Sequence, residues 1–334
     1  MKISGFRIAT IGNSKESGCR GPFRRAPSAT IRLNSGARSS LVLSEGVLYT
    51  QTPLLAENEN KIFGPAKYRN VEGIIATFRN KSLIHVGRNL QTINKGTVIA
   101  GQTYNWWHWL IEVLPKAFLA TKSAEEWADW PLILRSVGGV NPNVQQTVDI
   151  VLKDNTVKWA PPDSFFRVQD AIFWDGTVTL SREQLAPYRE LLRQEALAFP
   201  CVHAGERIFL KRAEGLSRRY NQSELSSIAE RFGFQIIDPA ETSLPELWTQ
   251  LSRARIVVGA QGAGWANTIV CPEGSVGLQW AGGRLRGKRF HDLADLCKMD
   301  LRTMVAQGDF GGDYVVDSAE FTKRLERALR DAGQ

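Results

Sequence analysis

Short apolar runs, separated by turn residues, alternate with amphipathic stretches along most of the chain. Between residues 45 and 95 the runs VLYTQTPLL, GIIATF and SLIHVG are rich in β-formers and bounded by Asn, Gly and Pro, which predicts short strands. Residues 104–122 predict a helix. Residues 131–180 place the apolar runs PLILRS, VKWA and DAIFWDG around the helical pattern VQQTVDIVL, and this alternation favours a mostly parallel sheet.

The same alternation is clearer in the second half of the chain. Residues 181–197 form a polar helical pattern suited to bridging two halves, and Pro187 in its middle predicts a kink or a late start. Further helices are predicted from the N-cap Asn221 through Arg231, after the cap Ser243, and over GAGWANTIV. The strands between them are ERIFLKR, FQIID, ARIVVG and SVGLQW. The fold class that follows is α/β.

Length and composition limit the type of protein. The chain has 334 residues, about twice a usual domain, so two domains are expected, over 45–195 and 196–334. No apolar run reaches the roughly 18 residues of a membrane span, and the first residues lack the apolar core of a secretory signal, so we expect a cytoplasmic protein. Its four cysteines lie far apart, which favours reduced thiols over a disulfide frame or a zinc site.

Residues 1–44 carry most of the net charge of +8, with eight basic residues against the single acid Glu16. This Ser/Gly/Arg-rich composition predicts a basic, flexible arm. Two functional interpretations stay open: peripheral contact with anionic lipid headgroups or an acidic partner, and an organellar targeting segment. Nucleic acid is disfavoured, because apart from Phe23 no aromatic residue interleaves with these arginines at stacking spacing.

Three glycines, Gly259, Gly262 and Gly264, lie between a predicted strand and a predicted helix in RIVVGAQGAGWANTIV. Glycine lets another group approach the backbone, and the N–H groups at the start of a helix attract anions, most often phosphate. The alternative is that Gly262 and Gly264 only permit tight helix–strand packing. The spacing is neither the dinucleotide fingerprint nor a P-loop, and no acid stands about 20 residues further on. A phosphate ligand of another kind is favoured over a nicotinamide cofactor.

A basic cluster follows an earlier strand end in the same half, in the sequence KRAEGLSRR. Arg212, Arg218 and Arg219 carry guanidinium groups, which pair with phosphate oxygens in a bidentate way. If the two strands share one sheet, these arginines and the Gly262 turn converge on a diphosphate. The alternative is a solvated basic loop.

Residues 101–116, GQTYNWWHWLIEVLPK, combine tryptophans with a few polar residues. His108 and Glu112 stand four residues apart and so share one helix face. A carboxylate beside an imidazole orients it and raises its pKa, as a general base requires. A buried, satisfied His–Glu pair is the equal alternative. Trp107 and Trp109 are expected in the core, and the spacing differs from that of the zinc-binding H-E-x-x-H motif, so no metal site is expected.

Together these segments resemble glycosyltransferase family 61. The family's N-x-x-H-W-x-x-E-x-x-P motif corresponds to Asn105 through Pro115. Its arginine-bearing strand end corresponds to Lys211-Arg212, followed by Arg218-Arg219-Tyr-Asn221. Its G-x-H-G-A-G-x-x-N motif corresponds to Gly259 through Asn267. The likeness covers about residues 80–285, and the glycine motif is its most specific part.

The resemblance implies two Rossmann-like domains facing across a cleft, the GT-B arrangement. It implies inverting, metal-independent transfer of a sugar from a nucleotide-diphosphate donor, UDP-linked by preference, to a glycan hydroxyl that is free or lipid-linked, with no cofactor. Bacterial relatives are linked to capsule and other surface polysaccharide synthesis. The candidate catalytic residues are His108 and Glu112, and those of the acceptor side are Asn105, Trp106 and Trp109. The candidate donor-binding residues are Arg212, Arg218, Arg219, Gly259, Gln261, Gly262, Ala263, Gly264, Asn267 and Gln279.

Three positions depart from the family pattern. Gln261 replaces the usual histidine, Gln222 replaces an acid after Asn221, and Gln279 replaces an acid near the end of the next strand. Glutamine still donates and accepts hydrogen bonds, so binding can survive, but a charged or proton-donating role at residue 261 cannot. A catalytically degenerate relative that binds nucleotide or glycan as a scaffold is therefore the alternative function.

Overall fold

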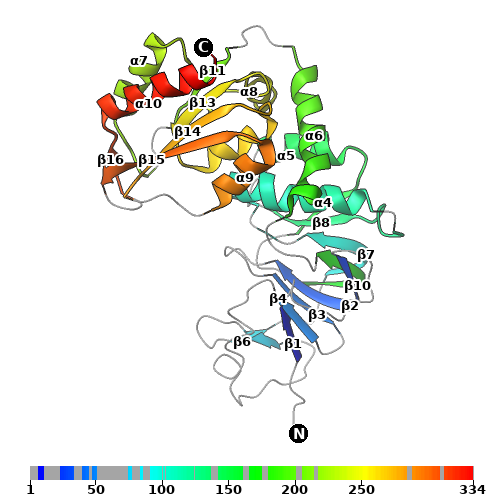
Figure 1. Cartoon of the computed structure of the whole chain (residues 1–334). Helices are drawn as coiled ribbons and strands as arrows, with labels where there is room; N and C mark the ends of the chain where they lie inside the picture. Colours follow the sequence, from blue (N-terminus) through cyan, green and yellow to red (C-terminus); the bar gives the residue numbers. More distant parts are fainter. Residues whose placement is uncertain are drawn as a thin grey trace. The chain divides into compact units, whose positions relative to one another are not determined.

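The protein comprises two compact units, Met1–Leu180 and Ser181–Gln334 (Figure 1). The computed structural model describes residues 7–10, 23–33, 40–44, 47–50, 74–76, 83–85, 91–99, 101, 103–123, 125–136, 142–160, 165–174, 180–200, 205–213, 217–283, 288–308 and 312–333. Both units contain parallel strands with helices between them, which confirms the predicted α/β class.

The first unit is built on a sheet in the order β1-β4-β3-β2-β10-β7-β8-β9. Its strands are β1 (Arg7–Thr10), β2 (Phe23–Leu33), β3 (Ser40–Ser44), β4 (Val47–Thr50), β7 (Gln91–Ile99), β8 (Leu132–Arg135), β9 (Val157–Ala160) and β10 (Phe165–Trp174). A separate hairpin pairs β5 (Ile74–Ala76) with β6 (Leu83–His85).

This sheet combines parallel and antiparallel pairs of strands. The strands β10, β7, β8 and β9 run parallel, as the alternation over 131–180 predicts. The helical segments of the unit are α3 (Trp106–His108), η1 (Trp109–Val113), α4 (Leu114–Thr121) and α5 (Pro142–Leu152). The strands β2, β3 and β4 form an antiparallel meander made by short connections, β2 pairs antiparallel with β10, and β1 pairs parallel with β4. The first unit is therefore a mixed sheet rather than a purely parallel one.

Part of the predicted basic arm is folded, which corrects that expectation. The strand β2 pairs with β10 along almost its whole length, and Ala29 is fully buried. Phe23 meets Trp174 edge to face at 5.2 Å between ring centroids. Arg25 forms ion pairs with Asp170 and, at 3.0 Å, with Glu126. Arg25 therefore serves the folded unit, while residues 1–6, 11–22 and 34–39 lie outside the described residues.

The second unit is built on a sheet in the order β12-β11-β13-β14-β15-β16. The strands from β12 to β15 are parallel and β16 is antiparallel. The strands are β11 (Arg207–Leu210), β12 (Gln235–Ile237), β13 (Ile256–Ala260), β14 (Val276–Gly282), β15 (Asp300–Gly308) and β16 (Tyr314–Val315). The helices are α6 (Arg182–Ala198), α7 (Gln222–Arg231), α8 (Leu244–Leu251), η2 (Ala263–Val270), α9 (Arg289–Cys297) and α10 (Ser318–Asp331).

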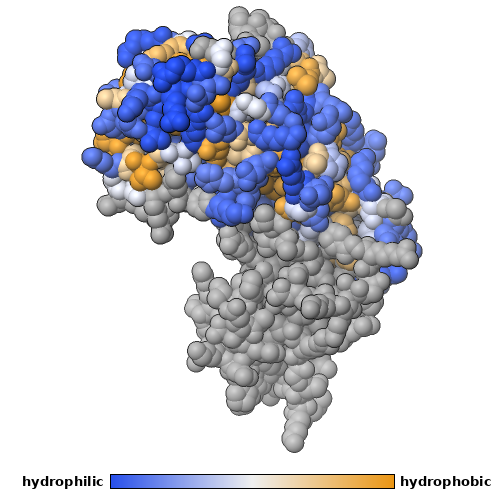
Figure 2. Space-filling model, in the orientation of Figure 1, coloured by the Kyte–Doolittle hydropathy of each residue, from blue (hydrophilic) through white to orange (hydrophobic). Residues whose placement is uncertain are grey.

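Helices cover both faces of the sheet of the second unit, and successive residues of β14 point to opposite faces. Leu278 and Trp280 belong to a core that includes Leu225 of α7 and Phe321 of α10. The outer surface over α7 and α10 is hydrophilic (Figure 2). Gln279, between those two core residues, points to the opposite face of the sheet, where η2, α8, α9 and α6 pack together.

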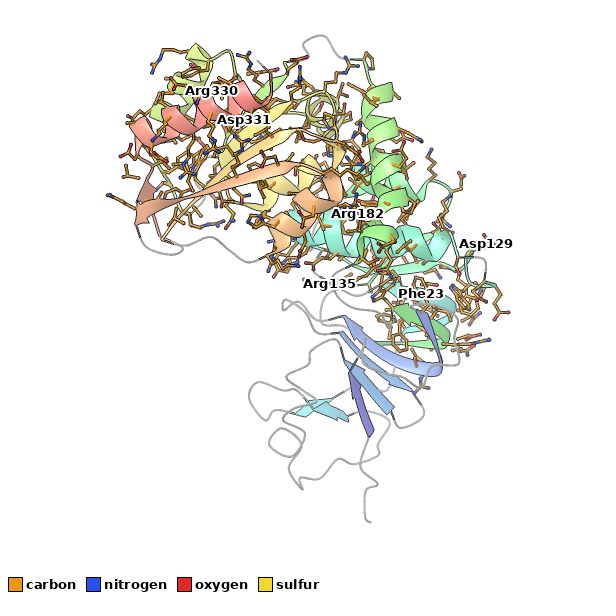
Figure 3. The ribbon with its side chains drawn as sticks, viewed as in Figure 1. Phe23, Asp129, Arg135, Arg182, Arg330 and Asp331 are labelled. Carbon is orange, nitrogen blue, oxygen red and sulfur yellow. The ribbon has the colours of Figure 1, made fainter. Side chains whose placement is uncertain are left out.

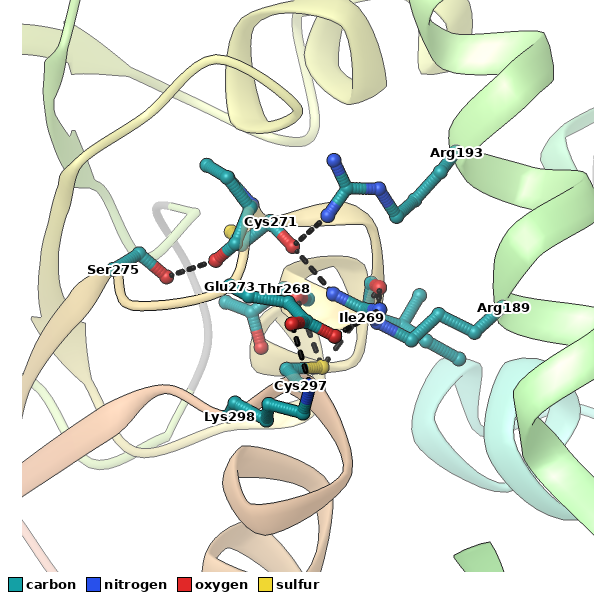
Figure 4. A network of polar contacts seen from close by, with 10 residues as sticks. Arg189, Arg193, Thr268, Ile269, Cys271, Glu273, Ser275, Cys297 and Lys298 are labelled. Atoms are coloured by element: carbon teal, nitrogen blue, oxygen red, sulfur yellow. Dashed lines mark hydrogen bonds and ion pairs between the residues drawn. The ribbon is translucent and has the colours of Figure 1, made fainter. Parts of the chain in front are cut away.

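The helix α6 belongs to the second unit, so the domain boundary differs from the expected position between residues 195 and 196. Arg189 donates to the carbonyls of Ile269 and Cys271 at 3.1 and 2.8 Å, and Arg193 donates to Cys271 at 2.9 Å (Figure 4). These bonds satisfy carbonyls at the end of η2, which a helix terminus leaves without partners. The helix begins at Arg182, so the predicted late start is wrong.

Two of the four cysteines can be assigned a state. Cys271 and Cys297 are buried free thiols, as predicted, and burial raises the pKa of Cys297 to about 11. Cys19 and Cys201 lie outside the described residues. In the described part of the chain, none of the helices combines the length and the apolar character that a membrane span requires.

Candidate functional site

The predicted His–Glu pair is present on the helix of the first unit. The Asn105 side chain caps this helix, since its Oδ1 accepts from the backbone N–H of Trp107 at 3.0 Å and of His108 at 3.4 Å. The Nδ1 of His108 lies 2.7 Å from Oε2 of Glu112. The side chains are 9% and 17% exposed, respectively. Asn105 thus fixes the start of the helix rather than extending toward a ligand.

The hydrogen bond to Glu112 determines how the imidazole can react. A carboxylate can only accept a hydrogen bond, so Nδ1 of His108 carries the hydrogen and donates the hydrogen bond to Glu112. The other ring nitrogen, Nε2, then holds a lone pair and is the atom able to take a proton. Glu112 lies in the π-helical segment η1, a rare winding often found at functional sites.

Lys116, one turn beyond Glu112, is a further candidate that was not predicted from the sequence. Its side chain is buried and its Nζ lies 5.6 Å from the ring centroid of Trp174. Burial lowers the pKa of Lys116 to about 8, while attraction to Glu112 acts in the opposite direction. The four-residue spacing from Glu112 is the signal that points to it. The helix therefore carries a stripe of three titratable side chains, His108, Glu112 and Lys116.

The tryptophans of this helix are mostly structural. Trp109 is 0% exposed and its Nε1 donates to Oγ1 of Thr147 at 2.8 Å. The ring is enclosed in the core, as expected, so Trp109 offers no surface for the acceptor-side role that was also predicted for it. Trp107 is also buried. Trp106 is half-buried, so it alone of the three retains surface for a ligand.

In the second unit the three glycines have different surroundings. A Cβ on Gly259 would lie 2.8 Å from the carbonyl oxygen of Leu210, so β11 excludes a side chain there. A Cβ on Gly262 would lie 3.0 Å from Nη1 of Arg212. A Cβ on Gly264 would meet nothing closer than Pro239, at 4.0 Å. Neither Gly262 nor Gly264 is thus explained by helix–strand packing.

The turn leads into a helix, as predicted, and this helix, η2, is of the 3₁₀ type. Gly262 is extended, with φ −174°. Gly262, Ala263 and Gly264 are half-buried, whereas every residue from Trp265 to Val270 is buried. The first turn of such a helix has backbone N–H groups without intrahelical acceptors, so this exposed edge is suited to an anion.

Arg212 joins the turn from the neighbouring strand. Its backbone is held by Gln222, whose Oε1 accepts from Arg212 N at 2.7 Å and whose Nε2 donates to Arg212 O at 3.1 Å. Its Nε donates to the carbonyl of Ser217 at 3.0 Å. Because β11 and β13 are parallel neighbours, Arg212 and Gly262 emerge at the same edge of the sheet, as predicted from the sequence.

The other two arginines of the cluster differ from Arg212. Arg219 is 78% exposed and pairs with Asp313 at 2.8 Å, with its backbone N–H also bound to Asp313. Arg218 adopts a positive φ of 65°. Burial raises the pKa of Tyr314 to about 12 although Arg212 and Arg218 act to lower it, which places both arginines near that ring.

Three further candidates are bonded inside the unit. Nε2 of Gln261 donates to Oε1 of Gln279 at 2.9 Å, and Gln279 is fully buried. Asn267 is buried too; its Oδ1 accepts from Trp248 at 3.0 Å and its Nδ2 donates to the carbonyl of Gly264 at 3.0 Å. Asn267, a candidate donor-binding residue, therefore shapes the turn.

The structure thus forms two candidate sites, one in each unit. The first contains His108, Glu112 and Lys116, and the second contains Arg212 with the exposed turn at Gly262–Gly264. Across the described ranges, no group of three or more His, Cys, Asp or Glu side chains is placed to hold a metal ion.

Both candidate sites lie in a segment of the chain that matches the model of a known family. A family model described as Glycosyltransferase 61 matches residues 106–278, just over half of the chain. The chain therefore belongs to glycosyltransferase family 61. It is a glycosyltransferase, an enzyme that uses a sugar donor and a glycan acceptor. A search of curated proteins found no match.

Proposed function

We propose that this glycosyltransferase moves a sugar from a nucleoside-diphosphate donor, UDP-linked by preference, to a hydroxyl of a glycan. The transfer inverts the anomeric carbon, needs no metal, and serves the synthesis of surface polysaccharide. The two units act as the two domains of a GT-B enzyme, with the donor on the second and the proton acceptor on the first. The resemblance of the three motifs supports this assignment.

One observation supports the donor site above all others: the Arg212 guanidinium lies against the bare Cα of Gly262. A guanidinium group and free backbone N–H groups together match the oxygens of a diphosphate. Both come from the carboxyl ends of parallel strands, where open α/β sheets bind ligands. The donor diphosphate therefore binds at Arg212 and the turn Gly262–Gly264, with Arg218 nearby.

The chemical step is a displacement at the anomeric carbon. The acceptor hydroxyl oxygen forms a bond to that carbon while its proton passes to Nε2 of His108. The bond from the anomeric carbon to the phosphate oxygen breaks, and its electron pair leaves with the nucleoside diphosphate. Glu112 stabilises the resulting imidazolium through Nδ1. Arg212 and the turn N–H groups face the charge that grows on the leaving phosphate.

A second function is favoured by the Gln261–Gln279 hydrogen bond. Two amides bonded to each other inside the unit provide neither charge nor a proton at the position of the family histidine. In this alternative the chain binds nucleotide or glycan as a scaffold without turnover.

Calorimetric titration with UDP, GDP, CMP and NAD tests the proposal. Tight binding of one nucleoside diphosphate, lost in Arg212→Met and kept in His108→Ala, supports the donor site. A sugar-transfer assay with the corresponding donor then separates the enzyme from the scaffold. Binding of NAD alone, or of none of the four, contradicts the proposed function.

A further inference from the structure

A buried arginine in the first unit has no role in the site described so far. Arg135 ends β8, is 6% exposed, and is labelled in Figure 3. Its Nε and Nη1 are buried and find no hydrogen-bond partner among the residues that the structure describes. Within the described part of the chain, no carboxylate forms an ion pair with it.

The surroundings of Arg135 form a polar edge next to the His108 helix. The guanidinium carbon lies 5.4 Å from the ring centroid of Tyr104, which is 54% exposed. Thr103, one residue earlier, is buried, and its hydroxyl also has no partner within the described ranges. Leu134 is in register with Ile99, so Arg135 lies at the carboxyl edge of the parallel strands β7 and β8. Ligands of open α/β sheets bind at such edges.

The charge of Arg135 cannot be removed by losing a proton. An arginine remains protonated in proteins, and a buried charge without a partner is strongly unfavourable. Lys116 shows the contrast, because its pKa falls to about 8 and Glu112 is close to it. Among the described residues Arg135 has no such carboxylate beside it, so an anionic ligand is the partner that its buried nitrogens lack.

We propose that Arg135, with Thr103 and Tyr104, binds an anionic oxygen group of the acceptor: a sugar carboxylate or a phosphate. The guanidinium donates from Nε and Nη1 to the oxygens, the Thr103 hydroxyl donates to a third position, and the Tyr104 ring covers the guanidinium face. This inference rests on the proposed transfer reaction, and it makes the enzyme selective for acidic or phosphorylated acceptors.

Calorimetry on the full chain without donor nucleotide tests the inference. The probes are methyl glucuronide, glucose 1-phosphate and neutral methyl glucoside at constant ionic strength. The two anions should bind at least about 10-fold more tightly than the neutral sugar, because bonds to charged groups are the stronger ones. The preferred anion distinguishes a carboxylate acceptor from a phosphate one. Equal binding of all three probes, or binding of none, overturns the inference.

Two variants and a control locate the anion. Arg135→Met should lose the anion preference, whereas Arg167→Met, an exposed arginine on β10, should keep it. Tyr104→Ala changes an exposed side chain and should weaken anion binding even if Arg135→Met does not fold. Unchanged anion binding in Arg135→Met or Tyr104→Ala overturns the inference. UDP affinity should be unaltered in Arg135→Met; if it is lost, Arg135 serves the donor and the acceptor assignment is overturned.

Discussion

The two candidate sites of this glycosyltransferase use opposite kinds of side chain. The helix of the first unit holds three titratable groups, His108, Glu112 and Lys116, in a mostly buried stripe. The turn of the second unit offers a permanently charged arginine, backbone N–H groups and neutral amides. The candidate site on the helix thus gathers groups that can exchange protons, and the candidate site at the turn gathers groups that can only bind.

This contrast predicts that the three glutamines of the second unit are compatible with donor binding. A site that binds phosphate needs donors in fixed positions, and Gln222 supplies such positions by holding the backbone of Arg212. A proton-transfer site depends on pKa values instead, so the same replacement in the first unit would abolish its chemistry. The two sites therefore tolerate different substitutions.

The largest expected effect comes from His108→Ala. Loss of a general base lowers the transfer rate by roughly 10²–10⁴-fold, while UDP binding stays unchanged because His108 lies in the other unit. His291→Ala, an exposed histidine in α9, is the matched control. Steady-state transfer kinetics check the prediction, and a weakened UDP affinity in His108→Ala would break the division between the two sites.

Lys116→Met tests the burial of charge in the first unit. The unfolded chain binds more protons than the folded one between pH 8 and 10.5, because the folded pKa is the lower, so wild-type stability rises with pH in that window. The cost is fully present below about pH 8 and corresponds to at most about 3 kcal/mol. Lys116→Met should therefore be more stable than wild type at pH 7.

The gain in Lys116→Met should fade as the pH approaches 10.5. Urea unfolding at several pH values measures it, and Lys122→Met, an exposed lysine at the end of α4, should show no such trend. A stability gain that is independent of pH would mean that burial of the ammonium is not its source.

Arg212→Met and Arg219→Met compare two arginines of one cluster. Arg212→Met should weaken nucleoside-diphosphate binding by roughly 10–100-fold, because bonds to charged groups are worth about 1.5–3 kcal/mol. Arg219 already pairs with Asp313 and is exposed, so its variant should lose much less. Titration with UDP measures both, and equal losses would place the diphosphate closer to Arg219 than proposed.

Gly264→Ala gives the smallest effect and the sharpest test of the turn. A Cβ there meets no atom closer than 4.0 Å, so stability should change by less than about 0.5 kcal/mol. UDP affinity should nevertheless fall, because the methyl group occupies space that the phosphate needs. An unchanged affinity would show that the ligand approaches elsewhere along the turn.

Local sequence patterns predicted those contacts of the two candidate sites that arise from residue spacing and from the order of strands, turns and helices. The four-residue spacing of His108 and Glu112 predicted their contact, and the strand–turn–helix pattern predicted that Arg212 and Gly262 meet. Lys116 follows the same spacing, but a lysine usually lies on a solvated face, so its burial was not expected.

Contacts between distant residues were beyond such patterns. The pairing of β2 with β10 joins segments more than a hundred residues apart in the sequence. Composition alone therefore predicted that the segment of β2 belongs to a flexible arm. The attachment of α6 to the second unit depends on Arg189 binding carbonyls at Ile269 and Cys271. Arg135 was similarly hidden, because the end of a strand does not reveal whether an arginine is exposed or enclosed.

The π-helical segment Trp109–Val113 determines the direction in which the side chains of the following helix α4 point around its axis. Its wider turn acts as one inserted residue in an α-helical ladder, and one residue corresponds to about 100° of rotation. Deleting a single residue there would turn Lys116 away from Trp174 while leaving His108 in place. The length of this segment is therefore constrained as strictly as its composition, and related chains that keep all three titratable residues should also keep their spacing without gaps.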